Sequence, residues 1–305
     1  MRIGLIDVDG HNYPNLPLMK ISAWHKSVRD SVEWYSPMFS GHMDKVYASK
    51  VFSFTQDYEY FIDADEVEYG GTGYAIRLID GREVYDQTKN KELPYEIEHM
   101  YPDYDLYGIT DTAYGFLTRG CPRGCSFCHV GNKEGMKSVK VADLSEFWNG
   151  QKNIVLMDAN ILACRDHMEL LGQLVQSGAK IDINQGLDAR LLTDANMELI
   201  KRIKLSSVHF AWDRMSDGKL IKTNLRKFKE ETGLGRRKVM VYILTNYDTT
   251  FEEDLERIEF CRSMDFSPYP MIYDKQHAPK IYRQLQRWCN NWIFWKTPTF
   301  DDYVA

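Results

Sequence analysis

The sequence has little of what would place a protein in a membrane, outside the cell or on nucleic acid. None of its apolar runs approaches the roughly 20 residues that a membrane-spanning helix needs. Its first residues, MRIGLIDVDG, lack the basic start, apolar middle and small-residue cleavage site of a signal peptide. The formal net charge of −6 argues against a protein that binds nucleic acid through its overall positive charge. A local basic patch that binds nucleic acid is still possible. These absences predict a cytoplasmic protein without membrane contact.

Cysteine is also scarce, with six residues in a chain of 305. Three of them fall within eight residues, at Cys121, Cys125 and Cys128, and the others stand singly in apolar patterns. A disulfide framework would space its cysteines more evenly through a smaller chain. The distribution therefore favours a metal site in a reducing compartment.

Short apolar runs alternate with helical patterns from the start, which is typical of an α/β protein with parallel sheets. We expect a small Rossmann-like domain over residues 1–80, with a strand at Arg2–Val8 and a helix at Leu16–Arg29. Its further strands are expected at Ser31–Tyr35, Lys45–Val51 and Glu66–Tyr69. Residues 81–112 are rich in charge, Tyr and Pro, and we expect them to form a linker.

A second alternation fills residues 113–305. The expected strands are Tyr114–Thr118, Ile154–Met157, Lys180–Asn184, Ser207–Trp212, Lys238–Leu244 and Phe266–Tyr273. The expected helices lie near Leu144–Trp148, His167–Ser177, Thr193–Ile203, Gly218–Thr232, Thr250–Met264 and Pro279–Trp295. This series predicts a partial (β/α)6 barrel with a C-terminal helix, whose active site is built at the carboxyl ends of the strands.

The clustered cysteines lie in the segment GCPRGCSFCH, directly after the first strand of this second unit. Glycine and proline let the loop turn, so three thiolates can converge on one small object. Three Cys ligands leave one iron of a four-iron cube open, whereas an electron-transfer cluster normally has four Cys ligands. We therefore predict a [4Fe–4S] cluster on Cys121, Cys125 and Cys128. The alternative is a Cys₃His zinc site with His129 or a distant His, although structural zinc ligands usually come as two separated pairs.

The pattern C-x-x-x-C-x-x-C, with Phe127 before the third Cys, resembles the radical S-adenosylmethionine superfamily, in the branch with a cobalamin-binding-like N-terminal domain. The resemblance is strongest from Tyr114 to Leu192. It implies that S-adenosylmethionine binds the open iron and is cleaved reductively to a 5′-deoxyadenosyl radical, which takes hydrogen from a substrate. It also implies an electron donor such as flavodoxin or ferredoxin. The motif identifies neither the substrate nor further catalytic residues.

The resemblance assigns residues at several strand ends to the cofactor. Phe127 would lie beside the adenine. Asp158 and Asn160 look like an Asp-x-Asn variant that would bind the methionine amine; an Asp/Asn turn is the alternative. In the segment IDINQGLDAR, Gln185 would face the cofactor and Arg190 would bind a carboxylate, unless Arg190 forms a surface salt bridge instead.

The next two strand ends add weaker candidates. Asp213 would bind the ribose hydroxyls, and Thr245 and Asn246 would lie near the adenine. Basic stretches such as Lys219–Lys229 could contact the phosphates of a nucleotide or nucleic acid, or they could be solvated helix faces.

Cobalamin is the remaining cofactor to weigh. The segment from Asp9 through His11 to Pro14 stands where some cobalamin proteins carry Asp-x-His-x-x-Gly, with the histidine able to ligate cobalt. Pro14 removes a backbone donor, and the domain has few helices to cover its sheet and cradle a corrin. We predict that it does not bind cobalamin. The alternative functions are a cobalamin-dependent methyltransferase of the same superfamily and a non-catalytic metal-binding module.

Overall fold

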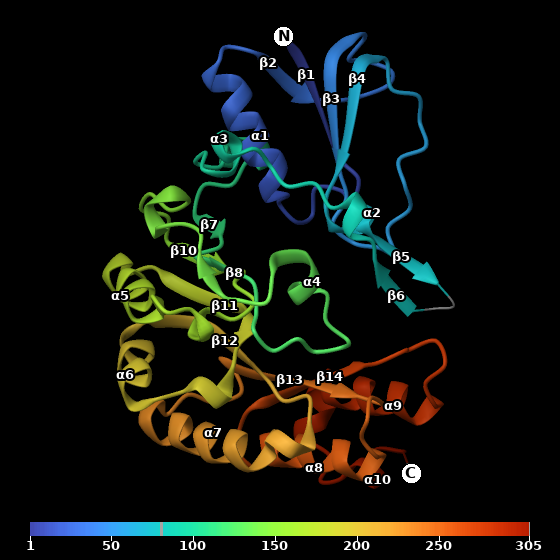
Figure 1. The fold of residues 1–305 in the computed structure, drawn as a ribbon. Helices are drawn as coiled ribbons and strands as arrows, with labels where there is room; N and C mark the ends of the chain where they lie inside the picture. Colours follow the sequence, from blue (N-terminus) through green and yellow to red (C-terminus); the bar gives the residue numbers. More distant parts are fainter. Residues whose placement is uncertain (80–81, 305) are drawn as a thin grey trace.

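The computed structural model describes residues 1–79 and 82–304 and shows an α/β protein with two parallel sheets. A four-stranded sheet lies in the N-terminal part and a six-stranded sheet in the remainder (Figure 1). The predicted domain boundary between residues 80 and 81 lies outside the described residues. Among the described helices, none combines the length and the apolar character needed to cross a bilayer.

The N-terminal sheet has the strand order β2-β1-β3-β4. Its strands are β1 (Arg2–Asp7), β2 (Ser31–Trp34), β3 (Met43–Ser49) and β4 (Ala64–Gly70). On one face, Ile3 and Leu5 of β1 pack against the helix α1 (Leu16–Ser27). On the other face, no helix is present among the described residues, and Tyr58 and Ile62 of the irregular β3–β4 connection cover the sheet.

Helix α1 connects the two parts of the molecule. It begins at Asn15, whose side chain accepts a hydrogen bond from the backbone N–H of Leu18. Leu18 packs toward the N-terminal sheet, whereas Leu16 and Met19 belong to the core of the C-terminal part. The helix therefore buries apolar residues on more than one face, as expected of a helix enclosed between two layers.

The expected linker contains regular structure. Its strand β6 (Arg82–Tyr85) pairs antiparallel with β5 (Ile76–Ile79), which lies in the expected N-terminal domain, and α3 (Tyr95–Glu98) and a 3₁₀ turn at Tyr104–Tyr107 follow. A short helix α2 (Thr72–Ala75) precedes them. Tyr104 is buried in the core of the C-terminal part, so this segment packs against the six-stranded sheet.

The six-stranded sheet follows the chain, with the order β14-β13-β12-β11-β10-β7. Its strands are β7 (Thr112–Gly115), β10 (Asn153–Leu156), β11 (Lys180–Leu187), β12 (Lys204–Ala211), β13 (Val239–Thr245) and β14 (Ser267–Ile272). The helices between and after them are α5 (His167–Ser177), α6 (Asp194–Arg202), α7 (Gly218–Thr232), α8 (Phe251–Ser263), α9 (Lys280–Cys289) and α10 (Phe300–Val304). The strands β7 and β14 are the two edges of the sheet, and the described strands show no closed barrel.

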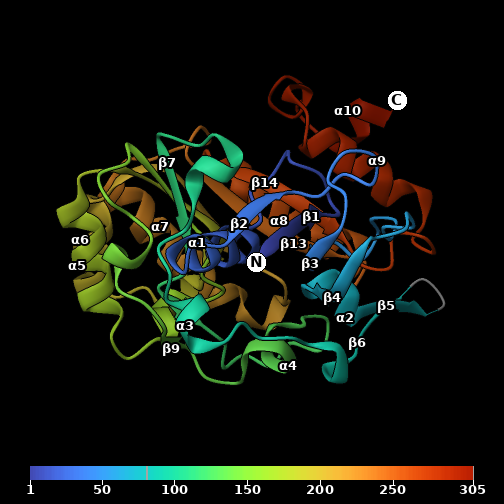
Figure 2. The same ribbon diagram turned by 90° about the horizontal axis from the view of Figure 1, so that it is seen from above.

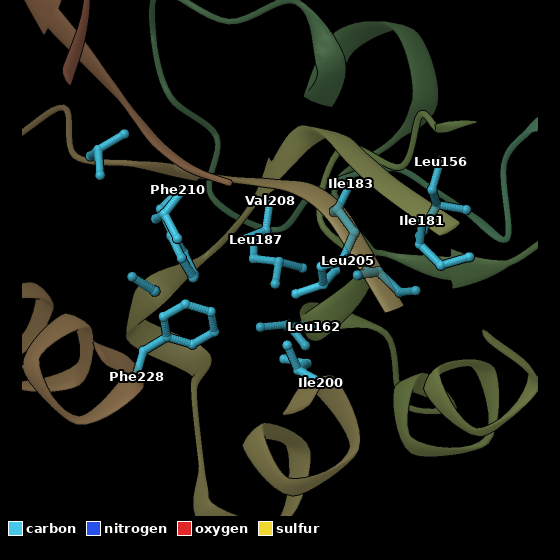
Figure 3. Close-up of a cluster of buried hydrophobic side chains, with 14 of the residues drawn as sticks. Leu156, Leu162, Ile181, Ile183, Leu187, Ile200, Leu205, Val208, Phe210 and Phe228 are labelled. Atoms are coloured by element: carbon cyan, nitrogen blue, oxygen red, sulfur yellow. The ribbon is translucent and has the colours of Figure 1, made fainter. Parts of the chain in front are cut away.

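The core lies between this sheet and its helices. In Figure 3, Ile183 of β11 and Phe210 of β12 lie in one layer with Ile200 of α6 and Phe228 of α7. Both views place α5 and α6 at one end of the sheet and α9 and α10 at the other (Figures 1 and 2). The apolar periodicity of the sequence thus gives one continuous core between the six-stranded sheet and its helices.

Three predicted elements differ from the structure. The helix expected near Leu144–Trp148 is only a 3₁₀ turn over Leu144–Glu146. The helix expected over Pro279–Trp295 ends at Cys289, because the side chain of Asn291 caps a separate turn at Trp292–Trp295. The strand expected over Tyr114–Thr118 divides into β7 and a second short strand, β8 (Thr118–Arg119), for a reason that lies in the site.

Candidate functional site

The three clustered cysteines lie on one long loop that two short strands close. Strand β8 pairs antiparallel with β9 (Val139–Lys140), and residues 120–138 between them include the helix α4 (Val130–Glu134). Gly120 has φ +86°, and a Cβ there would lie 2.2 Å from the carbonyl oxygen of Lys137. Only glycine fits this closure, so the glycine before Cys121 is needed for the shape of the loop.

The thiols differ in exposure. Cys121 and Cys125 are half-buried and Cys128 is exposed, while the three single cysteines are buried in the core. The backbone N–H of Cys128 donates to the carbonyl of Cys125 at 3.0 Å, which folds these two residues into one turn. Burial raises the pKa of the half-buried Cys125 thiol, and the neighbouring Cys121 raises it further. Within residues 1–79 and 82–304, no three His, Cys, Asp or Glu side chains stand close enough together to hold a metal ion. A bound metal would therefore require the loop to draw the sulfurs together.

Asp158 holds the start of this loop in place. Its carboxylate accepts hydrogen bonds from the backbone N–H of Leu117 at 3.1 Å and from the hydroxyl of Thr118 at 2.6 Å. The side chain is 1% exposed, and burial raises its pKa to about 6. These bonds take backbone donors that a continuous strand would use for pairing, which explains the break between β7 and β8. Both carboxylate oxygens are thus already occupied by protein donors.

Asn160 lies next to the first cysteine. Its side-chain Nδ2 is 3.5 Å from the sulfur of Cys121, and its backbone carbonyl accepts a hydrogen bond from the hydroxyl of Ser138. The residue is 3% exposed, yet its side-chain oxygen Oδ1 has no hydrogen-bond partner in the described part of the chain. Leaving such an acceptor unpaired costs about 1–3 kcal/mol. The position fits a ligand that brings a hydrogen-bond donor to the cysteine loop.

A cavity of about 180 Å³ lies beside Cys125 at the carboxyl edge of the sheet. Its lining consists of Arg123, Cys125, Arg190, Ala211, Asp213, Arg214, Asp217 and Ile221. The lining is strongly charged, and it joins the cysteine loop to residues that follow β11 and β12.

Ion pairs occupy two of the three arginines in this lining. Arg123 pairs with Asp188 at 2.5 Å, and Arg190 lies between Asp188, at 2.8 Å, and Asp217. The predicted cofactor residue Arg190 therefore has carboxylate partners from its own strand end and from the turn before α7. Arg214 also lines the cavity, and in the described structure its side chain makes no hydrogen bond or ion pair.

Asp213 is the second predicted cofactor residue in the cavity lining. Its Oδ1 accepts a hydrogen bond from the backbone N–H of Leu244 at 3.3 Å, and burial raises its pKa. Phe127 directly precedes Cys128 in the cysteine loop. Its ring packs edge to face with that of Tyr247, with ring centroids 5.1 Å apart. The carboxylate and the two aromatic rings thus come from three different segments of the carboxyl edge.

Three further predicted residues are not part of the cavity lining. The hydroxyl of Thr245 donates to the carbonyl of Met271, and Nδ2 of Asn246 donates to the carbonyl of Tyr273 at 3.0 Å. These bonds connect the end of β13 to β14 and to Tyr273, the residue directly after β14. Gln185 is exposed within an irregular part of the β11–β12 pairing. The structure therefore brings Cys125, Arg190 and Asp213 to one cavity but gives Thr245 and Asn246 structural partners.

Sequence reasoning missed several residues of the site. Asp217 pairs with Arg190 from a turn 27 positions later, and Tyr247 meets Ser126 across 121 positions. No local pattern marks such contacts. Arg123 carried a signal that could have been used, because it lies between two of the clustered cysteines.

The N-terminal part contributes contacts to the cysteine loop and an exposed histidine. The ring of His129, next to Cys128, stacks on Tyr85 of β6 at 6.1 Å. His11 lies against Trp34, with ring centroids 4.1 Å apart. Its position at the carboxyl edge of the N-terminal sheet is fixed by aromatic packing.

The basic stretch on α7 is largely paired. Lys222, Lys227 and Lys229 contact Glu256, Asp194 and Asp265, respectively. These ion pairs favour the interpretation of this stretch as a helix face that packs against carboxylates of its neighbours.

No known family model matches the chain, and no curated protein matches it.

Proposed function

We propose that this protein is a radical S-adenosylmethionine enzyme with a [4Fe–4S] cluster on Cys121, Cys125 and Cys128. The observation that carries the proposal is the buried, unpartnered oxygen of Asn160 beside Cys121. It places an acceptor for an ammonium group next to a loop with three thiols. The donor set fits a cluster with one open iron, because the motif supplies three thiolates and not four.

The residues of the chain have distinct roles in this proposal. When bound, the cluster would supply the electron that cleaves the sulfonium of S-adenosylmethionine. Asn160 accepts a hydrogen bond from the amino group of that molecule, and Asp213 accepts hydrogen bonds from hydroxyl groups. Phe127 provides an apolar ring against which a flat base can pack. Asp158 does not contact the cofactor in this proposal; it holds the start of the loop that carries the thiols.

The proposal includes the finer fold. The six-stranded sheet in chain order is the arrangement expected of a partial (β/α)6 barrel with its site at the carboxyl ends of the strands. The strand order of the N-terminal sheet is that of the first four strands of a flavodoxin-like fold, which supports a Rossmann-like domain. This domain does not bind cobalamin in the proposal, because a single helix covers one face of the sheet and His11 packs against Trp34.

Anaerobic reconstitution tests the proposal. We expect about four irons and four sulfides per chain. With dithionite, or with reduced flavodoxin or ferredoxin, the protein should convert S-adenosylmethionine to 5′-deoxyadenosine and methionine, both measured by liquid chromatography. Stoichiometric zinc without sulfide in anaerobically isolated protein would favour a metal-binding module. An intact, reducible cluster without cleavage would reject the enzymatic role.

A further inference from the structure

A second cavity, of about 440 Å³, lies at the amino-terminal edge of the six-stranded sheet. Lys180 is the first residue of β11, Lys204 is the first residue of β12, and Lys238 directly precedes β13. All three line this cavity, together with Lys201 near the end of α6. Because the strands are parallel, these starts lie at the edge opposite the cysteine loop. The cavity is therefore separate from the candidate site described above.

The charge of the lining is of one sign. It contains four lysines and no aspartate or glutamate. Lys180 lies beside Lys204 in the register of the parallel strands β11 and β12, so two like charges repel each other at this edge of the sheet. An anion bound in the cavity would relieve this repulsion between the two lysines.

Internal partners neutralise little of this charge. Lys204 donates to the carbonyl of Gly178 at 3.0 Å, and Lys238 donates to the carbonyl of Leu205 at 2.8 Å. Carbonyl oxygens orient these ammonium groups without cancelling their charge. Lys201 reaches one carboxylate, that of Glu231, at 3.4 Å. In the described part of the chain, the side chain of Lys180 makes no hydrogen bond or ion pair.

The rest of the lining is mainly apolar. Ile200 and Leu205 are buried in the core layer shown in Figure 3, and Ile203 is buried as well. Leu234 is half-buried, so Leu234 and the methylene stems of the lysines supply the apolar surface that a ligand can reach. A volume of about 440 Å³ is in the range of small-molecule pockets. A free inorganic ion would leave the half-buried side chain of Leu234 uncovered.

We propose that this cavity binds a small amphiphile, with a carboxylate or phosphate head held by the lysine ammonium groups and an apolar body against Leu234 and the methylene stems of the lysines. The proposal goes beyond the enzymatic function and does not depend on it. Since Lys180 and Lys204 begin β11 and β12 and Lys238 directly precedes β13, the ligand would bridge the starts of these three strands.

Isothermal titration of the folded chain of 305 residues with decanoate and with decyl phosphate, below their micelle concentrations, tests the proposal. We expect one saturable site for at least one of them, and a preference between the two would identify the head group. Decanol lacks the charge, and acetate and inorganic phosphate lack the apolar body. We expect each of these three probes to bind at least tenfold more weakly.

Two variants assign the binding to this cavity. Lys180→Glu should weaken binding at least tenfold, and it should fold well because it replaces a Lys–Lys pair across β11 and β12 with a Glu–Lys pair. Ser206→Trp places a bulky side chain at an exposed lining position and should block the site. Lys91→Glu, at an exposed lysine outside the lining, is the matched control and should bind like the unmodified protein. Thermal unfolding of each variant confirms that it is folded.

Unchanged affinity in folded Lys180→Glu would overturn the proposal, because the amphiphile would then bind elsewhere. Inorganic phosphate binding as tightly as decyl phosphate would also overturn it, because the apolar surface would contribute nothing. Absence of saturable binding by both amphiphiles would have the same consequence. None of these results depends on cluster assembly or on cleavage of S-adenosylmethionine.

Discussion

The carboxylate of Asp158 accepts a hydrogen bond from the hydroxyl of Thr118 at 2.6 Å, three residues before Cys121 in the sequence. Burial raises the pKa of this carboxyl from 3.8 to about 6. Between pH 4 and pH 6, the Asp158 carboxyl is therefore protonated in the folded protein and ionised in the unfolded chain. This contribution to the free energy of unfolding is fully present below about pH 4 and is lost as the pH rises through about 6.

The first prediction concerns the size of this effect. A shift of about two pKa units corresponds to roughly 3 kcal/mol. Asp158→Asn cannot titrate, so its stability relative to the unmodified protein should rise by roughly 2–3 kcal/mol between pH 4 and pH 7. Urea unfolding of both proteins at several pH values measures this difference. Parallel pH profiles for the two proteins would contradict the assignment.

The second prediction tests the unpartnered oxygen of Asn160. Asn160→Leu removes the acceptor and should weaken binding of S-adenosylmethionine about tenfold or more, because a hydrogen bond to a charged group contributes about 1.5–3 kcal/mol. Asn160→Asp keeps an acceptor and should retain binding. Equilibrium dialysis on anaerobically reconstituted protein gives the affinities, and iron analysis shows that the cluster is retained.

Asn149→Leu is the control for this series. Asn149 is exposed, and in the described structure its side chain makes no hydrogen bond. It should therefore bind S-adenosylmethionine as the unmodified protein does. Equal affinities for Asn160→Leu and Asn149→Leu would show that the buried oxygen does not face this ligand.

The third prediction separates the two groups of cysteines. Cys121→Ala, Cys125→Ala and Cys128→Ala should each abolish iron and sulfide incorporation, because each replacement removes one of the three proposed ligands. Cys164→Ala and Cys261→Ala remove buried thiols of the core and should leave the cluster content unchanged. Iron and sulfide analysis after anaerobic reconstitution decides between them. A cluster lost equally in Cys164→Ala and Cys125→Ala would show that the ligand set is wrong.

Much of the fold could be predicted because apolar periodicity reports burial directly. The helices α5 and α7 have the predicted bounds, and the strands of both sheets were expected within a few residues. The exceptions have local causes that periodicity does not contain. The carboxylate of Asp158 takes the donors between β7 and β8, and Asn291 caps a new turn after α9.

The site was less predictable because its geometry depends on contacts between distant segments. The sequence placed the thiols on one loop and Arg190 and Asp213 at strand ends. It could not show that Asp217 pairs with Arg190, nor that Thr245 donates its hydroxyl to a backbone carbonyl. Polar residues at strand ends serve either a ligand or the backbone, and only their partners distinguish the two uses.

The last prediction concerns the ion pair between Asp254 and Arg257, whose side chains are both 0% exposed. The guanidinium of Arg257 also donates to the carbonyls of Trp212 at 2.6 Å and Leu244 at 2.8 Å. These carbonyls directly precede Asp213 and Thr245, so Arg257 fixes the ends of β12 and β13 at the candidate site. Removing one partner of a buried pair leaves an uncompensated charge and costs about 3–5 kcal/mol.

Asp254→Ala and Arg257→Met should therefore each lower the free energy of unfolding by about 3–5 kcal/mol, and the double variant should lose clearly less than the sum. Glu256→Ala is the matched control on the same helix. It breaks the partly exposed pair with Lys222 and should cost less than about 1 kcal/mol. Urea unfolding of the four variants measures these values. Additive losses in the double variant would contradict the coupling, because they would mean that each side chain is stabilised by partners other than the opposite charge.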